Sequence, residues 1–257
     1  MGDLAVQDRR QAGVTRTVCY SPALTNQRSI RLGDVACIGR ELLILNHFVL
    51  VLRIWLVAVV ACSAVVAPIF LWVDVPAARH FWNADHLGSP MNVLFGSTVI
   101  LAAESAVVLS AVLARLLKGR ISVFGETLAI ACLVSMCAYA VNDHVLKVVF
   151  GVPSTAEVVR GASHAMNLWK GSLGSSFPSG HMVLAGAFAG VFMRLHRTTV
   201  WLLSGLLLIA AACLLVGDWH FLSDIVAGAF VGVSAGVLAG EGWVAHLARQ
   251  WSSGRAS

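Results

Sequence analysis

Charged side chains are scarce in this sequence, and the scarcity excludes most soluble folds. Only 12% of the 257 residues are charged and 58% are hydrophobic, whereas a soluble domain carries about 25% charged residues. The mean hydropathy is +0.81. The six cysteines lack the spacing of a metal or redox site, and the N-terminal stretch lacks the apolar core of a signal peptide. These absences favour a polytopic membrane protein.

Long apolar segments account for the missing charge. Apolar character begins at Leu42, and the first segment long enough to cross a bilayer follows the interruption at Arg53. The six segments expected to span the membrane are 54–73, 93–117, 128–149, 180–195, 200–216 and 221–240. The sequence therefore predicts an all-α fold, a bundle of six transmembrane helices.

The distribution of positive charge predicts the orientation of this bundle. Six spans place both termini on one side, and with that assignment 14 Lys and Arg residues lie on that side and four on the other. The positive-inside rule then predicts that both termini are cytoplasmic. We expect a basic, flexible cytoplasmic arm over residues 1–41, a membrane domain over 42–241 and a cytoplasmic tail over 242–257.

Two ionisable residues, His220 and Asp224, stand at the outer edge of the last apolar segment. A spacing of four on a helix places both side chains on one face. The carboxylate can then orient the imidazole through one nitrogen and leave the other free as a nucleophile. The alternative is a satisfied polar pair at a helix start, although ionisable residues at the lip of a membrane span are usually functional.

A second candidate segment is Phe177-Pro178-Ser179-Gly180-His181, at the start of the fourth apolar segment. Ser179 is a suitable helix N-cap, and Gly180 lets a ligand approach the backbone. Free N–H groups at a helix start bind anions, so this segment offers a phosphate group donors with an imidazole beside them. A capped helix with an incidental histidine is the alternative.

Lys147 and a series of glycines complete the pattern. Lys147 lies at the outer end of the third segment, where either snorkelling or an anionic ligand explains a cation. Glycines recur every four residues on the two segments that carry the histidines, at 186 and 190 and at 228, 232, 236 and 240. Small residues at this spacing allow transmembrane helices to pack closely, which would hold the two imidazoles in register.

These motifs resemble those of the type 2 phosphatidic acid phosphatase superfamily, membrane lipid phosphatases related in fold to vanadium haloperoxidases. The family motif Pro-Ser-Gly-His is intact at Pro178–His181. The motif Ser-Arg-x5-His-x3-Asp keeps His220 and Asp224, but its Ser-Arg positions read Cys213-Leu214. The resemblance spans about residues 146–228.

The remaining family motif, Lys-x6-Arg-Pro, departs further. It keeps Lys147, but its Arg-Pro positions read Ser154-Thr155, and the earlier arginine of some relatives is replaced by Val152. Because Leu214 stands at the arginine position of the other motif, both phosphate-clamping arginines are missing. Arg160 and Lys170, in the connection before the fourth segment, are possible phosphate-binding substitutes; two solvated loop charges are the alternative.

The resemblance implies a role for each matched residue. His220 would attack phosphorus, Asp224 would orient His220, and His181 would protonate the leaving group and then activate water. Lys147, Ser179 and Gly180 would bind the phosphoryl oxygens, and neither a metal nor a cofactor would be needed.

The expected function is that of a lipid phosphate phosphatase acting on a phosphomonoester or a polyprenyl (pyro)phosphate through a phosphohistidine. A lipid phosphotransferase and a catalytically weakened lipid-phosphate-binding protein remain as alternatives. The expected partners are the lipid phosphate and membrane lipids, with no nucleic acid, and the sequence leaves the oligomeric state open. A bacterial inner membrane with the site on its outer face is the expected location.

Overall fold

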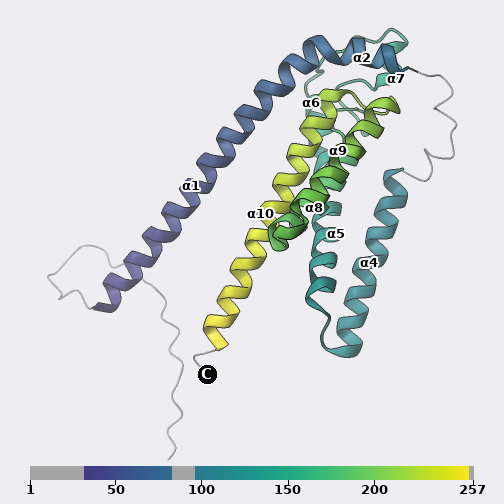
Figure 1. Cartoon of the computed structure of the whole chain (residues 1–257). Coiled ribbons are helices and arrows are strands. Elements are labelled where there is room, and N and C mark those ends of the chain that lie inside the picture. The colour runs from purple at the N-terminus through teal and green to yellow at the C-terminus, as the bar shows by residue number, and fades with distance from the viewer. Residues whose placement is uncertain (1–31, 83–95, 255–257) are drawn as a thin grey trace, which may run out of the picture. The chain divides into compact units, whose positions relative to one another are not determined.

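The computed structural model describes residues 32–82 and 96–254, and over these ranges it contains helices and no strand (Figure 1). The chain divides into two compact units, residues 1–58 and residues 59–257. The arm expected over 1–41 lies largely outside the described residues, although the helix α1, Leu32–Pro68, already includes its last ten. The expected tail likewise begins inside a helix, because α10 continues to Gly254.

Five stretches of helix are long and apolar enough to cross a membrane, so the chain is an integral membrane protein. They are Val49–Phe81, Ser97–Lys118, Val123–Val159, Arg197–Val216 and Leu222–His246. The predicted fourth span corresponds to α8, Gly180–Leu195, which has only 16 residues. A helix of that length rises about 24 Å, which is less than the ~30 Å hydrocarbon core of a bilayer. The sixth span and the orientation of the termini stay predictions.

The first predicted span ends later than expected. The helix continues past Val73 through η1, Ile69–Val73, and α2, Asp74–Phe81, where the sequence indicated a polar connection. Asp74 does not interrupt the helix, and its carboxylate is wholly buried and accepts a hydrogen bond from the Ser223 N–H at 3.0 Å.

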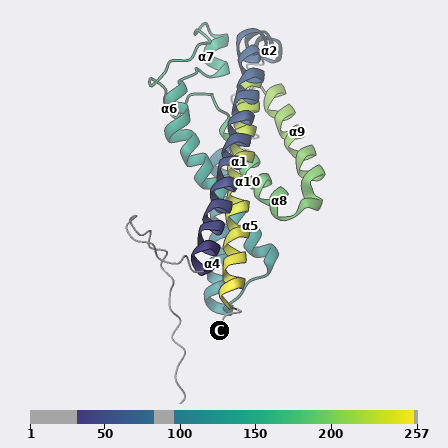
Figure 2. The same ribbon diagram turned by 90° about the vertical axis from the view of Figure 1, so that its left-hand side faces the viewer.

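The helices of the second unit differ in what they contact. Helix α8 packs mainly against α10, Leu222–Gly254, and α5, Val123–Val141, and both views show α8 and α10 side by side (Figures 1 and 2). By contrast, α4, Ser97–Lys118, and α9, Val200–Val216, expose large apolar side chains such as Leu116 and Trp201. Apolar exposure on this scale suits contact with lipid.

The predicted close packing of the glycine-bearing helices is confirmed. A Cβ atom built on Gly228 would lie 2.5 Å from the Ser179 carbonyl oxygen, and one on Gly232 would lie 2.5 Å from the Val183 carbonyl oxygen. From the other side, a Cβ on Gly186 would lie 3.0 Å from the Val233 nitrogen. Only hydrogen side chains permit this backbone contact, which places the start of α8 against the start of α10.

One irregular segment connects α5 to α8. The helix passes through η3, Asn142–Leu146, and α6, Lys147–Phe150, and ends at Gly151 with a left-handed φ of 56°. The short helix α7, Thr155–Val159, follows, and the chain then returns to Pro178. This segment brings Lys147 and the Pro-Ser-Gly-His motif to the same end of α5 and α8.

Candidate active site

The two motif histidines meet. The Nδ1 atom of His181 lies 3.4 Å from the Nε2 atom of His220, and the ring centroids are 5.6 Å apart in an edge-to-face arrangement. The two residues are 39 positions apart in the sequence and come from different helix starts. Convergence of these rings, predicted from the motifs, is therefore confirmed by the geometry.

The start of α8 has the structure that its sequence indicates. The Ser179 Oγ accepts a bond from the Met182 N–H at 3.4 Å, so Ser179 is the N-cap of α8, as predicted. A side chain at Gly180 would collide with the Tyr139 ring, because a Cβ there would lie 2.8 Å from a ring carbon. Glycine at this position lets α8 begin directly against α5.

The two helix starts are joined through the backbone. The Ser179 N–H donates to the Asp224 carbonyl oxygen at 3.1 Å. Asn142 contributes from η3, since its side-chain Nδ2 donates to the Pro178 carbonyl oxygen at 3.2 Å. These two bonds fix the Pro-Ser-Gly-His backbone from both sides, and the positions of the imidazoles follow from them.

His220 and Asp224 are close but differ in detail from the expected helical pair. His220 lies just before α10, in the turn that precedes Leu222. Its Nδ1 is 3.5 Å from the Asp224 Oδ2, which is an ion-pair distance and longer than a hydrogen bond. The same Oδ2 accepts the Phe221 N–H at 3.0 Å. Asp224 is wholly buried, so its carboxylate is held at the helix start beside the ring.

Lys147 is buried in the same region, but its charge is already paired. Its Nζ lies 2.7 Å from the Asp143 Oδ1. The Asp143 Oδ1 is in turn 3.7 Å from the position of a Cβ on Gly180, so the ion pair lies beside the start of α8. The structure thus brings Lys147 to the Pro-Ser-Gly-His segment, together with the neutralising carboxylate of Asp143.

The positions at which the Lys-x6-Arg-Pro motif departs from the family pattern serve the packing of the connecting segment. Val152 is wholly buried and packs with Val66 and Phe177. Ser154 caps α7 in a reciprocal arrangement with Glu157, and the Thr155 hydroxyl donates to the Asp218 carbonyl oxygen at 2.8 Å. None of these three residues offers a cation.

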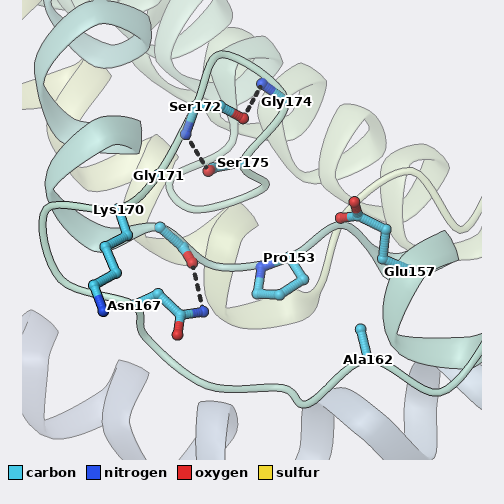
Figure 3. A pocket seen from close by; sticks show the side chains of 10 residues that line it. Pro153, Glu157, Ala162, Asn167, Lys170, Gly171, Ser172, Gly174 and Ser175 are labelled. Atoms are coloured by element: carbon cyan, nitrogen blue, oxygen red, sulfur yellow. Dashed lines mark hydrogen bonds between the residues drawn. The ribbon is translucent and has the colours of Figure 1, made fainter.

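Arg160 and Lys170 are both exposed. Lys170 lines an open pocket of about 310 Å³ in the connecting segment, together with Glu157 and Asn167 (Figure 3). Asn167 crosses this pocket to donate to the Gly151 carbonyl oxygen at 3.2 Å. Neither motif histidine lines the pocket. Phosphate binding by Arg160 or Lys170 stays a prediction.

Two further residues near the site, Asp74 and His164, were missed in the sequence. Asp74 binds Ser223 at the start of α10, and His164 approaches Asp74 from the segment after α7. The sequence carried one signal for Asp74, because a carboxylate at the end of an apolar run is rare without a function. Asp143 precedes Lys147 by four residues, a spacing that suits an ion pair on one helix.

Metal binding has no obvious location in the described part of the chain. Over residues 32–82 and 96–254, no group of three or more His, Cys, Asp or Glu side chains is placed to hold an ion. The polar atoms that could contact a phosphoryl group are instead the two imidazoles, the Lys147 ammonium, the Ser179 hydroxyl and the N–H groups at the start of α8.

One comparison with known proteins gives a match. The sequence model described as the PAP2 superfamily matches residues 127–244, a range that includes Lys147, both histidines and Asp224. Comparison with curated proteins gives no match, and comparison with solved structures gives none either. Over residues 127–244 the chain therefore matches the PAP2 superfamily, the family that its motifs resemble.

Proposed function

We propose that this protein is a lipid phosphate phosphatase that works through a phosphohistidine at His220. The observation that carries the proposal is the 3.4 Å approach of the His181 and His220 nitrogens. One imidazole can serve as nucleophile while its neighbour supplies a proton, and this pair of tasks is what cleavage of a phosphate ester requires. The match of residues 127–244 to the PAP2 superfamily supports a phosphatase-type reaction.

In the first step, the His220 Nε2 attacks phosphorus and the P–O bond to the lipid breaks. The electron pair leaves with the lipid oxygen, which takes a proton from His181 and departs as an alcohol. Asp224, beside the other ring nitrogen at 3.5 Å, stabilises the positive charge that develops on His220. An in-line P–O bond does not fit within 3.4 Å, so substrate binding has to part the two rings.

In the second step, His181 takes a proton from water, and the resulting hydroxide oxygen attacks phosphorus. The P–N bond breaks, inorganic phosphate leaves and His220 recovers its electron pair. Lys147, the Ser179 hydroxyl and the Gly180 N–H would hold the equatorial oxygens, where charge spreads during transfer. The free N–H groups of a helix start suit this task.

The proposed setting is a bilayer with the site on its outer face. With α8 counted as a sixth, shorter span, both termini lie in the cytoplasm, as the distribution of Lys and Arg favours. The His181 and His220 rings then lie at the non-cytoplasmic end of the helices. A lipid phosphomonoester or a polyprenyl (pyro)phosphate of the outer leaflet of a bacterial inner membrane is the proposed substrate.

Transfer to an alcohol is the second candidate, and the ion pair of Lys147 with Asp143 favours it. With both clamping arginines replaced and Lys147 paired at 2.7 Å, the described site has little spare positive charge. A phosphomonoester carries −1.5 to −2 at neutral pH, whereas a phosphodiester carries −1. A site with less positive charge suits the diester, whose phosphoryl group would pass to an acceptor alcohol.

One assay separates these functions. Detergent-solubilised protein is incubated with a labelled lipid phosphate in the presence of a chelator, with and without an acceptor alcohol. Release of inorganic phosphate that disappears in His220→Asn supports the phosphatase, and label on the alcohol supports the transferase. Phosphate release that His220→Asn leaves intact would overturn the proposed mechanism. Binding of the lipid without turnover would indicate a lipid-phosphate-binding protein.

A further inference from the structure

A second carboxylate, Asp74, is bound to the helix that carries Asp224. Asp74 lies at the start of α2, is wholly buried and accepts two hydrogen bonds from one residue. The Ser223 N–H donates to its Oδ1 at 3.0 Å, and the Ser223 hydroxyl donates to its Oδ2. The first N–H groups of a helix have no partner within the helix. Asp74 supplies, from 149 positions away, the acceptor that an N-cap side chain normally provides.

This contact is adjacent to the residues of the candidate active site. Ser223 precedes Asp224, whose side chain binds the Phe221 N–H and whose carbonyl oxygen accepts the Ser179 N–H. The first turn of α10 is therefore held by one carboxylate from inside the turn and by another from α2. Negative charge at a helix N-terminus is favourable, so both carboxylates stabilise the same turn.

His164 supports Asp74 from the segment after α7. Its Nε2 lies 3.7 Å from the Asp74 Oδ2. Its ring stacks on Phe70 with centroids 4.2 Å apart and lies 4.4 Å from the Phe221 ring. Burial lowers the pKa of His164 below its ordinary value of 6.5. A neutral His164 can fill the space beside Asp74 without cancelling the negative charge at the helix start.

We propose that Asp74 is a positioning residue for the phosphoryl-transfer site: it fixes the first turn of α10 and thereby the placement of His220 opposite His181. This inference rests on the proposed function. Displacement of a reacting group by 1 Å costs on the order of 100-fold in rate. Loss of the Asp74 contact therefore lowers kcat while leaving the groups that bind the lipid phosphate in place.

The test compares Asp74→Ala, Asp74→Asn and Ser223→Ala with the wild-type protein, using phosphatidic acid in detergent micelles as the probe. Glu104→Gln is the matched control, because Glu104 is another buried carboxylate on a membrane helix, α4, away from α10. Steady-state kinetics give KM, and they give kcat per mole of folded protein. Hydrogen exchange of peptides covering residues 217–228 reports the stability of the helix start.

We expect Asp74→Ala to lower kcat about 10- to 100-fold with KM changed less than about threefold. Asp74→Asn, which keeps one acceptor oxygen, should recover part of kcat, and Ser223→Ala should also reduce it. Exchange over 217–228 should accelerate in these variants and not in Glu104→Gln. If Asp74→Ala does not fold, the Asn variant and Ser223→Ala carry the test.

Two other results would be decisive in the opposite direction. A kcat per folded protein within about twofold of wild type in the Asp74 and Ser223 variants, or a change confined to KM, overturns the positioning role and leaves the phosphatase intact. Absence of any His220-dependent turnover in the wild-type protein overturns the proposed function itself, and the inference about Asp74 falls with it.

Discussion

Two histidine–carboxylate pairs flank the start of α10, and the contrast between them shows what makes one pair suited to chemistry. His220 lies 3.5 Å from Asp224, and His164 lies 3.7 Å from Asp74. In both pairs the carboxylate is wholly buried. The separations are thus nearly the same, although His220 approaches its carboxylate through Nδ1 and His164 through Nε2.

The surroundings of the rings differ. The second nitrogen of His220 faces His181, whereas His164 lies between the Phe70 and Phe221 rings. Apolar rings on both sides disfavour a charged imidazole and leave no place for a phosphoryl group. The neighbour of the ring, and not the carboxylate, therefore distinguishes the proposed nucleophile from a packing residue.

The largest expected effect follows from substitution of His220. His220→Asn removes the proposed nucleophile, and we expect lipid phosphate hydrolysis to fall at least about 1,000-fold, because nucleophile and base act as a unit. Phosphate release in detergent measures the effect, and thermal unfolding checks the fold. Residual activity within about tenfold of wild type would contradict the assignment of His220.

Removal of the charge on Asp224 should have the next largest effect. Asp224→Asn keeps the shape of the side chain but loses the charge that stabilises protonated His220, and we expect kcat to fall about 100-fold. KM should change little. A variant in which KM rises and kcat is kept would indicate that Asp224 acts in binding instead.

The approach of His181 to His220 could be predicted from the sequence, because its signals are local. Pro178–His181 specifies a capped helix start with an imidazole, and the glycines four residues apart specify which helices approach. The residue types and spacings therefore predicted that His181 and His220 would meet. The only detail lost was that His220 precedes α10 and does not lie in it.

The pair of His164 and Asp74 could not be predicted in the same way. Asp74 follows an apolar run, so the sequence indicates the start of a polar connection there. Its contact with Ser223 has no local signal, because the two residues are 149 positions apart. His164 lies in a segment without periodicity, and its burial depends on two aromatic rings from other elements. The sequence also predicted α8 as a membrane span, and its packing against α5 as well as α10 emerges only in the structure.

A smaller effect should follow from freeing Lys147. Asp143→Asn removes the carboxylate that lies 2.7 Å from the Lys147 ammonium, and the cation then becomes available to a phosphate oxygen. We expect the inhibition constant of inorganic phosphate to fall about 3- to 10-fold, in line with one charge-assisted hydrogen bond. Weaker inhibition by phosphate in this variant would show that Asp143 orients Lys147 instead of neutralising it.

The smallest expected effect concerns His164 and the dependence of thermal stability on pH. Burial lowers the pKa of His164, so the unfolded chain binds the proton more tightly than the folded protein does. The contribution of neutral His164 to stability is complete above pH 6.5 and is lost as the pH falls through the lower folded pKa. His164→Gln should therefore reduce the loss of thermal stability between pH 7.5 and pH 5. An unchanged loss would show that other groups cause it.

The central claim is that His220 receives the phosphoryl group, and trapping the intermediate tests it most directly. The protein is mixed with a lipid phosphate labelled at phosphorus, quenched in alkali, where phosphohistidine survives, and digested for peptide mapping. We predict label on the peptide that contains His220, with none in His220→Asn. Label on a different residue, or rapid turnover that leaves no label on His220 under any quench time, would contradict the account.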